Sequence, residues 1–97
     1  MKVLFHAPTA PALARARAAA ANLHRQSHEG MVRIVASDEA VVAAVRVPDP
    51  DTDVLLILCR RALEAHGVNP PAGIELAPDA GYLLARLQAK GWRYVRA

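Results

Sequence analysis

Residues 53–67 read DVLLILCRRALEAHG, and this stretch decides the fold. It begins with an uninterrupted apolar run, Val54–Leu58, which is typical of a strand buried on both faces, as in a parallel sheet. The only cysteine, Cys59, follows directly, and a short helical segment from Arg60 to His66 then ends at Gly67. The thiol is therefore predicted at the junction of a buried strand and a helix, where α/β proteins bind their ligands.

The rest of the chain alternates short apolar strands with helices. Further strands are expected over residues 1–6, 31–36, 73–77 and 92–95, and further helices over residues 10–25, 39–45 and 80–90. The expected N-caps of these three helices are Thr9, then either Ser37 or Asp38, and finally Asp79. Residues 47–52, which contain the PDPDT motif, are expected to form a loop. This alternation predicts one domain over residues 1–97, a three-layer α/β/α sandwich with a five-stranded, mainly parallel sheet.

Composition narrows the class of protein. A hydrophobic fraction of 54% with only 4% aromatic residues predicts an aliphatic, alanine-rich core. No apolar run approaches the roughly 20 residues that span a bilayer, and the apolar segment at the N-terminus is too short for a secretory signal, so no membrane association is expected. A single cysteine suits a reducing, cytoplasmic setting. The net charge of +3 is spread along the chain, which does not favour nucleic acid as a partner.

No cofactor or metal motif is present in the sequence. The five glycines form neither G-x-G-x-x-G nor a P-loop, so no nucleotide cofactor is expected. His24, His28 and His66 are interpreted as surface residues near helix ends, so no metal site is expected.

Polar side chains follow the expected strands, and the carboxyl ends of parallel strands meet at one edge of a sheet. We therefore expect His6, Ser37, Asp38 and Cys59 to be neighbours. Cys59 is the catalytic candidate, because a helix N-terminus and the two arginines that follow it favour the thiolate. The candidate binding residues are His6, Ser37, Asp38 and Arg60. Cys59 is expected to be partly accessible, and the alternative of an inert thiol packed among apolar residues stays open.

Four stretches of the chain form a series that is typical of one family. They are KVLFHAPTAP (2–11), IVASDEAVVAAV (34–45), the pattern C-x-x-A-L-x-x-x-G-x-x-P (59–70), and GIELAPDAGYLLARLQAKGWRYVRA (73–97). In this order they resemble the DsrE/DsrF-like family of small sulfur-metabolism proteins, which includes the TusD-type sulfur-relay subunits. The resemblance covers almost the whole chain.

The resemblance implies a parallel α/β/α domain that forms homo-oligomers, commonly trimers or hexamers, without a prosthetic group. Some members accept sulfur as a persulfide on a cysteine after the third strand, and Cys59 matches that position. The expected function is a sulfur carrier or sulfurtransferase-like subunit, with sulfur-donor and sulfur-acceptor proteins as partners. The alternative is a non-catalytic oligomeric binding or regulatory module in which Cys59 is inert. The exposure of Cys59 is the feature that distinguishes the two.

Overall fold

The strands of the protein lie side by side in one parallel sheet. A computed structural model describes residues 1–26 and 31–97, so the expectation for His28 lies outside the described residues. The strands are β1 (Lys2–Ala7), β2 (Met31–Ala36), β3 (Leu56–Cys59), β4 (Glu75–Ala77) and β5 (Arg93–Arg96). Their order across the sheet is β4-β3-β2-β1-β5, and every neighbouring pair is parallel. The predicted α/β class with a five-stranded parallel sheet is confirmed.

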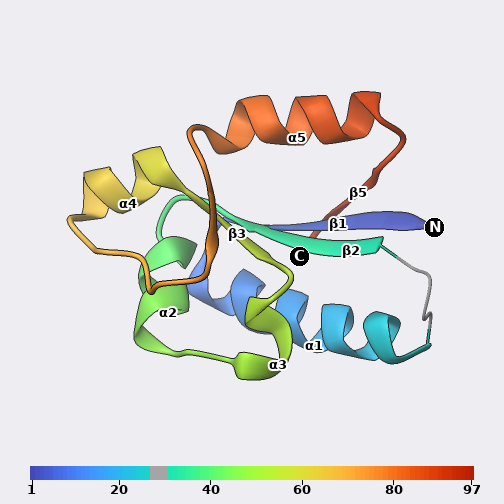
Figure 1. Cartoon of the computed structure of the whole chain (residues 1–97), viewed down its shortest axis with the longest axis horizontal. Helices are drawn as coiled ribbons and strands as arrows, with labels where there is room; N and C mark the ends of the chain where they lie inside the picture. Colours follow the sequence, from blue (N-terminus) through green and yellow to red (C-terminus); the bar gives the residue numbers. More distant parts are fainter. Residues whose placement is uncertain (27–30) are drawn as a thin grey trace.

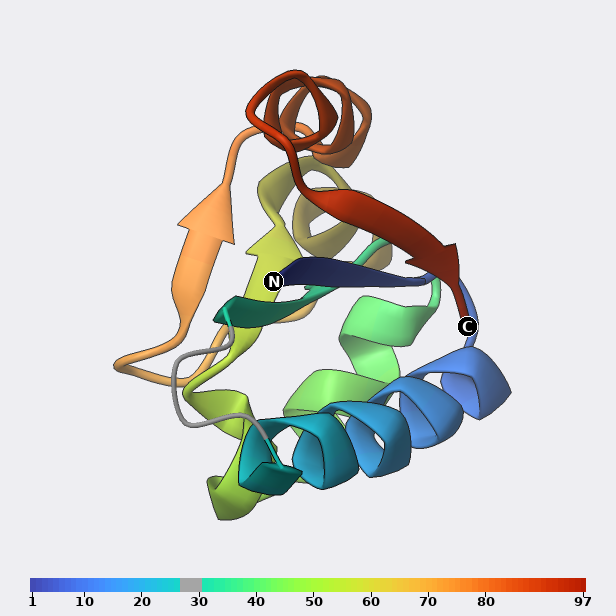
Figure 2. The same cartoon turned by 90° about the vertical axis from the view of Figure 1, so that its right-hand side faces the viewer.

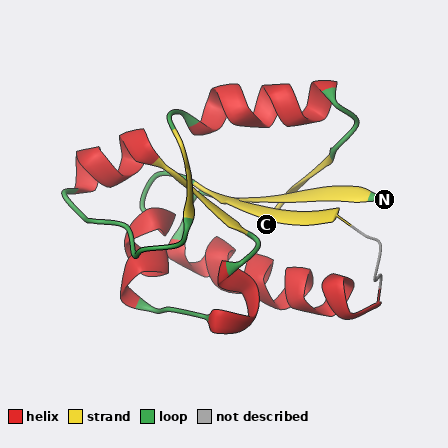
Figure 3. Ribbon diagram, in the orientation of Figure 1, coloured by secondary structure: helices red, strands yellow, loops and turns green. Residues whose placement is uncertain are grey.

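Helices cover both faces of this sheet. They are α1 (Ala10–Gln26), α2 (Ala40–Arg46), α3 (Pro50–Asp53), α4 (Arg60–His66) and α5 (Ala80–Ala89). The first three lie on one face and α5 lies on the other, which gives the three layers seen in Figure 1 and, coloured by secondary structure, in Figure 3. Figure 2 shows α5 above the sheet, on the path from β4 at one edge to β5 at the opposite edge. No helix within the described ranges is long and apolar enough to cross a membrane.

The core lies mainly between the sheet and α1. All four residues of β3 are buried, as expected for a strand covered on both faces. On α1 the side chains of Leu13, Ala16 and Ala20 are buried, and the small alanines let the helix pack closely against the sheet. The helix begins as predicted, because the Ala12 N–H donates to the hydroxyl oxygen of Thr9 at 3.1 Å.

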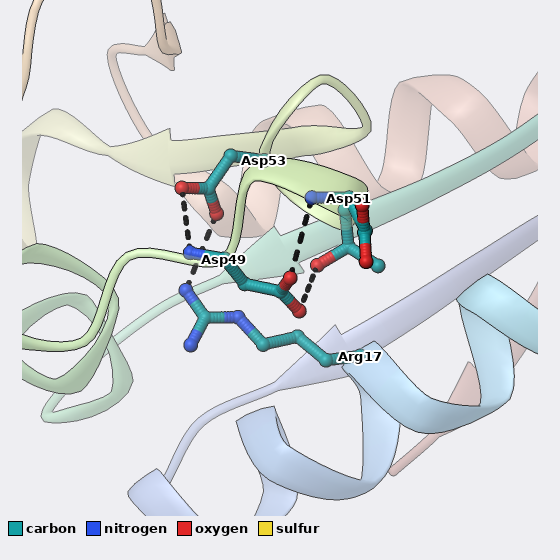
Figure 4. A network of polar contacts seen from close by, with 5 residues as sticks. Arg17, Asp49, Asp51 and Asp53 are labelled. Carbon is teal, nitrogen blue, oxygen red and sulfur yellow. Dashed lines mark hydrogen bonds and ion pairs between the residues drawn. The ribbon is translucent and has the colours of Figure 1, made fainter.

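The prediction of a loop over residues 47–52 is wrong in its second half, because α3 begins at Pro50. Proline fits the first position of a helix, where its missing N–H would have no intrahelical partner. Asp49 caps the helix by accepting from the Asp51 N–H at 3.3 Å (Figure 4). It also accepts from the Thr52 hydroxyl at 2.8 Å. The prolines and aspartates of this segment therefore signal a helix start as well as a turn.

The predicted start of the buried strand is also wrong. Val54 belongs to the end of α3, where its side chain is 75% exposed, and β3 begins only at Leu56. The short helix α3 ends in a turn at Val54 and Leu55, two residues that the apolar pattern assigns to the strand. It also brings Asp53 to α1, where its carboxylate pairs with Arg17 at 3.3 Å (Figure 4).

Neither Ser37 nor Asp38 caps α2 with its side chain, contrary to the prediction. The N-cap is Glu39, which makes no side-chain cap hydrogen bond, and the Ala40 N–H donates to the Ser37 backbone oxygen at 3.0 Å. The Ser37 hydroxyl instead lies within hydrogen-bond distance of the imidazole of His6. Asp79, by contrast, caps α5 as predicted, accepting from the Tyr82 N–H at 3.0 Å.

Candidate functional site

The strand register places the predicted site residues on one face of the sheet. His6 on β1 is level with Val35 on β2, which is level with Ile57 on β3. Side chains alternate between faces along a strand, so Ser37 and Cys59, each two positions further on, lie on the same face as His6. This is the face that α5 covers. The expectation that these residues meet at the carboxyl edge therefore follows from the observed register.

A cavity of about 480 Å³ opens between this edge and the helices α4 and α5. It has the size of a small-molecule site. Its lining comes from the carboxyl ends of β1, β2 and β3, from α4, and from α5 with its N-cap: His6, Ser37, Asp38, Cys59, Arg61, Ala62, Ala65, Asp79, Ala80, Gly81 and Leu84. The strand ends thus supply the imidazole, the hydroxyl and the thiol, whereas the helices and the N-cap of α5 supply the apolar wall together with Arg61 and Asp79.

His6 is held through both nitrogens of its ring. Nδ1 lies 2.7 Å from the phenol oxygen of Tyr94 on β5, and Nε2 lies 2.9 Å from the hydroxyl of Ser37. The Ser37 hydroxyl is also 3.3 Å from Oδ2 of Asp38. Its single proton goes either to Nε2 or to that carboxylate, and the tautomer of His6 is set accordingly. These contacts fix the imidazole at the cavity wall and join β1, β2 and β5.

The environment of His6 favours its neutral form. Burial and the nearby positive charge of Arg96 lower its pKa below the ordinary value of 6.5, while the negative charge of Asp38 acts in the opposite direction. At neutral pH the imidazole therefore keeps one unprotonated ring nitrogen, which can accept a proton.

Asp38 occupies a backbone conformation that is uncommon for its residue type. Its φ is 50°, in the left-handed region, which aspartate tolerates better than most residues but still at some cost. The turn carries the chain from β2 into α2 while leaving the Asp38 carboxylate beside Ser37, on the wall of the cavity. Residues held in such conformations cluster at active sites and ligand-binding sites.

Cys59 lines the cavity but is more buried than the sequence predicts. Its exposed fraction is 5%, so the prediction of a partly accessible thiol is wrong for this conformation of the chain. The reason is that Cys59 is both the last residue of β3 and the N-cap of α4, and the helix start closes over it.

Of the two arginines after Cys59, the second reaches the cavity. Arg60 is exposed and does not line the cavity, so its position does not match that of the other predicted binding residues. Arg61 lines it and lies 3.4 Å from the carboxylate of Asp79, the N-cap of α5. This pair spans the opening between the two helices, with the Arg61 side chain largely in solvent.

Two contributors to the site are not among the predicted binding residues. Tyr94 reaches His6 because β5 pairs with β1, and strand order cannot be read from an apolar pattern. The sequence could have predicted that Arg61 lies at the cavity, since the direction of its side chain depends only on where α4 begins and on the helical period. Among the described residues, no group of three or more His, Cys, Asp or Glu side chains is arranged to hold a metal ion.

The fold and site define a parallel α/β protein with a thiol and an imidazole at the carboxyl edge of its sheet. No protein-family model and no curated protein matches the chain. A solved structure with the same fold is that of MTH1491 from Methanobacterium thermoautotrophicum, described as a protein of unknown function. The two chains are 21% identical and superpose with a TM-score of 0.75, over 99% of this chain and 98% of that one. At this identity the likeness shows the fold alone.

Proposed function

We propose that the protein is a sulfur carrier of the DsrE/DsrF-like kind, in which Cys59 accepts sulfur as a persulfide. The observation that carries the proposal is the position of the only thiol on the wall of a cavity that also holds an imidazole, a hydroxyl and a carboxylate. The sequence patterns that resemble this family, including the one beginning at Cys59, support the same assignment.

The chemistry requires little beyond an activated thiol. The Cys59 thiolate attacks the terminal sulfur of a donor persulfide, R–S–SH, and a new S–S bond forms while the bond between that sulfur and R–S breaks. The products are the Cys59 persulfide and the thiolate R–S⁻, so atoms and charge balance and no outside oxidant is needed. A partner thiolate then removes the terminal sulfur by the same exchange. A cavity of about 480 Å³ accommodates a small persulfide or the tip of a cysteine-bearing loop.

A second candidate function has one observation in its favour. The 5% exposure of Cys59 is what an inert, packed thiol would have, and it fits a non-catalytic oligomeric binding or regulatory module. In that case the cavity binds a ligand through His6, Asp38 and Arg61, and the sulfur of Cys59 only contributes to the wall.

We propose that the protein forms homo-oligomers, as trimers or hexamers, and that its other partners are sulfur-donor and sulfur-acceptor proteins. The edge strand β5 supports self-association, because all four of its residues are exposed and include Tyr94 and Val95. An unpaired strand edge with apolar side chains is a surface that natural proteins usually cover.

The two candidates give opposite results in a loading experiment. The native protein is incubated with glutathione persulfide, the small donor is removed, and the intact mass is measured. A sulfur carrier gains the mass of one sulfur atom, and Cys59→Ser gains none. If the native protein gains no sulfur while the same protein gains it after denaturation, Cys59 is inert in the fold and the binding-module function takes its place.

A further inference from the structure

We propose that Ser37 and His6 form a proton relay for Cys59, held in place by Tyr94. This inference rests on the proposed function, and it names the residues that remove the thiol proton during sulfur transfer. His6 is the final proton acceptor, Ser37 passes the proton on, and Tyr94 is a positioning residue.

The strand register gives the relay its order in space. β2 lies between β1 and β3, so a residue at the end of β2 separates the ends of the other two strands. Ala36 is level with Leu58, which puts Ser37, the next residue, level with Cys59 across a parallel-strand spacing of about 4.8 Å. Ser37 thus follows the strand that lies between the strands of His6 and Cys59, and all three residues line the same cavity.

The hydrogen bonds of His6 suit a proton acceptor. When the Ser37 hydroxyl donates to Nε2 over 2.9 Å, Nδ1 carries the ring proton and donates to the Tyr94 phenol oxygen over 2.7 Å. After Nε2 is protonated, both ring N–H groups keep an oxygen acceptor, Ser37 on one side and Tyr94 on the other. A nucleophile, a base and a third group that orients the base form the arrangement used for activated nucleophiles in general.

Charged and titratable groups surround the relay on three sides. Tyr94 and Arg96 come from β5, Asp38 comes from the turn after β2, and the Arg61–Asp79 pair comes from α4 and α5. Burial and Arg96 hold the pKa of His6 below 6.5 against the opposing effect of Asp38. The imidazole of His6 is therefore neutral at rest and is able to take up the thiol proton as the sulfur attacks.

The step is balanced without any group from outside. The Cys59 thiol gives its proton to Ser37, whose own proton passes to Nε2 of His6, as the sulfur attacks the terminal sulfur of R–S–SH. The S–S bond of the donor breaks, and the leaving thiolate takes the proton back from the imidazolium. The sum is Cys59–SH plus R–S–SH giving Cys59–S–SH plus R–SH.

The relay is tested by the rate at which iodoacetamide alkylates the native protein between pH 5 and 9, in wild type and variants. The chain has one cysteine, so the labelled site is unambiguous. His6→Gln and Ser37→Ala are each expected to slow alkylation at pH 7 at least about tenfold, the low side of what general-base assistance contributes. Both should also remove the fall in rate that accompanies protonation of His6 in the wild type. Tyr94→Phe should give a smaller loss and shift the position of that fall.

Two matched controls separate the relay from a general effect on folding. His24→Gln and Tyr82→Phe alter exposed residues outside the cavity and should leave the rate profile unchanged. Unfolding midpoints are measured for every variant, and only variants that are folded at the assay temperature are compared.

The outcomes distinguish the relay from the proposed function. If Cys59 loads sulfur but His6→Gln and Ser37→Ala keep the wild-type pH profile, the relay is overturned and the sulfur carrier stands. If Cys59 neither loads nor reacts in the native protein, the proposed function fails and the relay fails with it. Loading together with loss of the His6-dependent limb in both variants supports the relay.

Discussion

The phenol oxygen of Tyr94 lies 2.7 Å from Nδ1 of His6, and so the last strand of the chain orients a side chain of the first. β5 is an exposed edge strand that, within residues 1–26 and 31–97, pairs only with β1. The rings of Tyr94 and His6 also approach each other, with centroids 5.7 Å apart. The C-terminal β5 strand therefore contributes to the candidate site as well as to the sheet. A change in the packing of β5 would reach the cavity through His6.

The Arg17–Asp53 pair should contribute more to stability than the Arg61–Asp79 pair. The former joins α1 to α3 with side chains only 11% and 17% exposed, and no hydrogen-bond partner is found for Arg17 Nε in the described part of the chain. Asp53→Asn leaves the guanidinium without its charge partner, and we expect it to lower the free energy of unfolding by about 1–3 kcal/mol. Urea unfolding provides the measurement.

Asp79→Asn is the matched control for this prediction. Asparagine caps a helix about as well as aspartate, so the variant removes only the largely exposed charge pair with Arg61. The expected loss is under about 1 kcal/mol. Equal losses in the two variants would show that burial does not strengthen the Arg17–Asp53 pair.

Stability should depend on pH through His6. Its pKa is lower in the folded protein than the 6.5 of an unfolded chain, so the unfolded state binds more protons as the pH falls. The contribution of His6 to stability is therefore complete above about pH 6.5 and is lost progressively below it, down to the folded pKa. Urea midpoints from pH 5 to 8 should rise with pH and then level off. In His6→Gln this part of the slope should disappear, and an unchanged slope would show that another group causes the pH dependence.

Two glycines should respond in opposite directions to replacement by alanine. Gly67 ends α4 with a φ of +65°, where a Cβ meets no atom within 4 Å but the backbone conformation itself is strained for any residue with a side chain. Gly67→Ala should cost about 1 kcal/mol. Gly81 lies in the first turn of α5, and its added Cβ would make only an ordinary contact of 3.5 Å with Asp79. Gly81→Ala should stabilise by about 0.4–1 kcal/mol. Thermal unfolding of both variants checks the pair, and a stabilising Gly67→Ala would show that the turn tolerates a side chain.

Self-association should depend on the edge that β5 presents. Light scattering at a protein concentration of about tens of micromolar should give a mass well above that of one chain, because even a weak oligomer persists at this concentration. Val95→Lys places a charge on this edge and should shift the protein toward monomer. Arg86→Lys, on exposed α5, keeps its charge and should leave the mass unchanged. A wild-type monomer under these conditions would contradict the proposed oligomer.

The sequence predicts the edge at which the site forms better than it predicts the members of the site. An apolar run such as residues 54–58 indicates a buried strand, and alternation with helices makes that strand parallel to its neighbours, so His6, Ser37 and Cys59 follow without any knowledge of strand order. Tyr94 depends on β5 lying beside β1, which is a long-range choice that local patterns do not encode.

The failure of the strand start and that of the accessible thiol have physical reasons that the residues make clear. Asp49 and Pro50 are helix-start residues, and they extend α3 into the apolar run so that Val54 becomes exposed. The accessibility of Cys59 depends on how closely α4 and α5 approach the sheet edge, which is a matter of packing rather than of composition. Charge near a thiol can be read from a sequence, but its burial cannot.

The most direct test of the proposed function follows a labelled sulfur atom through the protein. The donor is glutathione persulfide whose terminal sulfur is isotopically heavy, and an acceptor thiol is added after the donor has been removed. Peptide mass spectrometry should find the heavy sulfur first on the peptide that contains Cys59 and then on the acceptor, with neither product in Cys59→Ser. If the acceptor stays unlabelled and the Cys59 peptide of the native protein keeps its original mass, Cys59 carries no sulfur and the proposed function is contradicted.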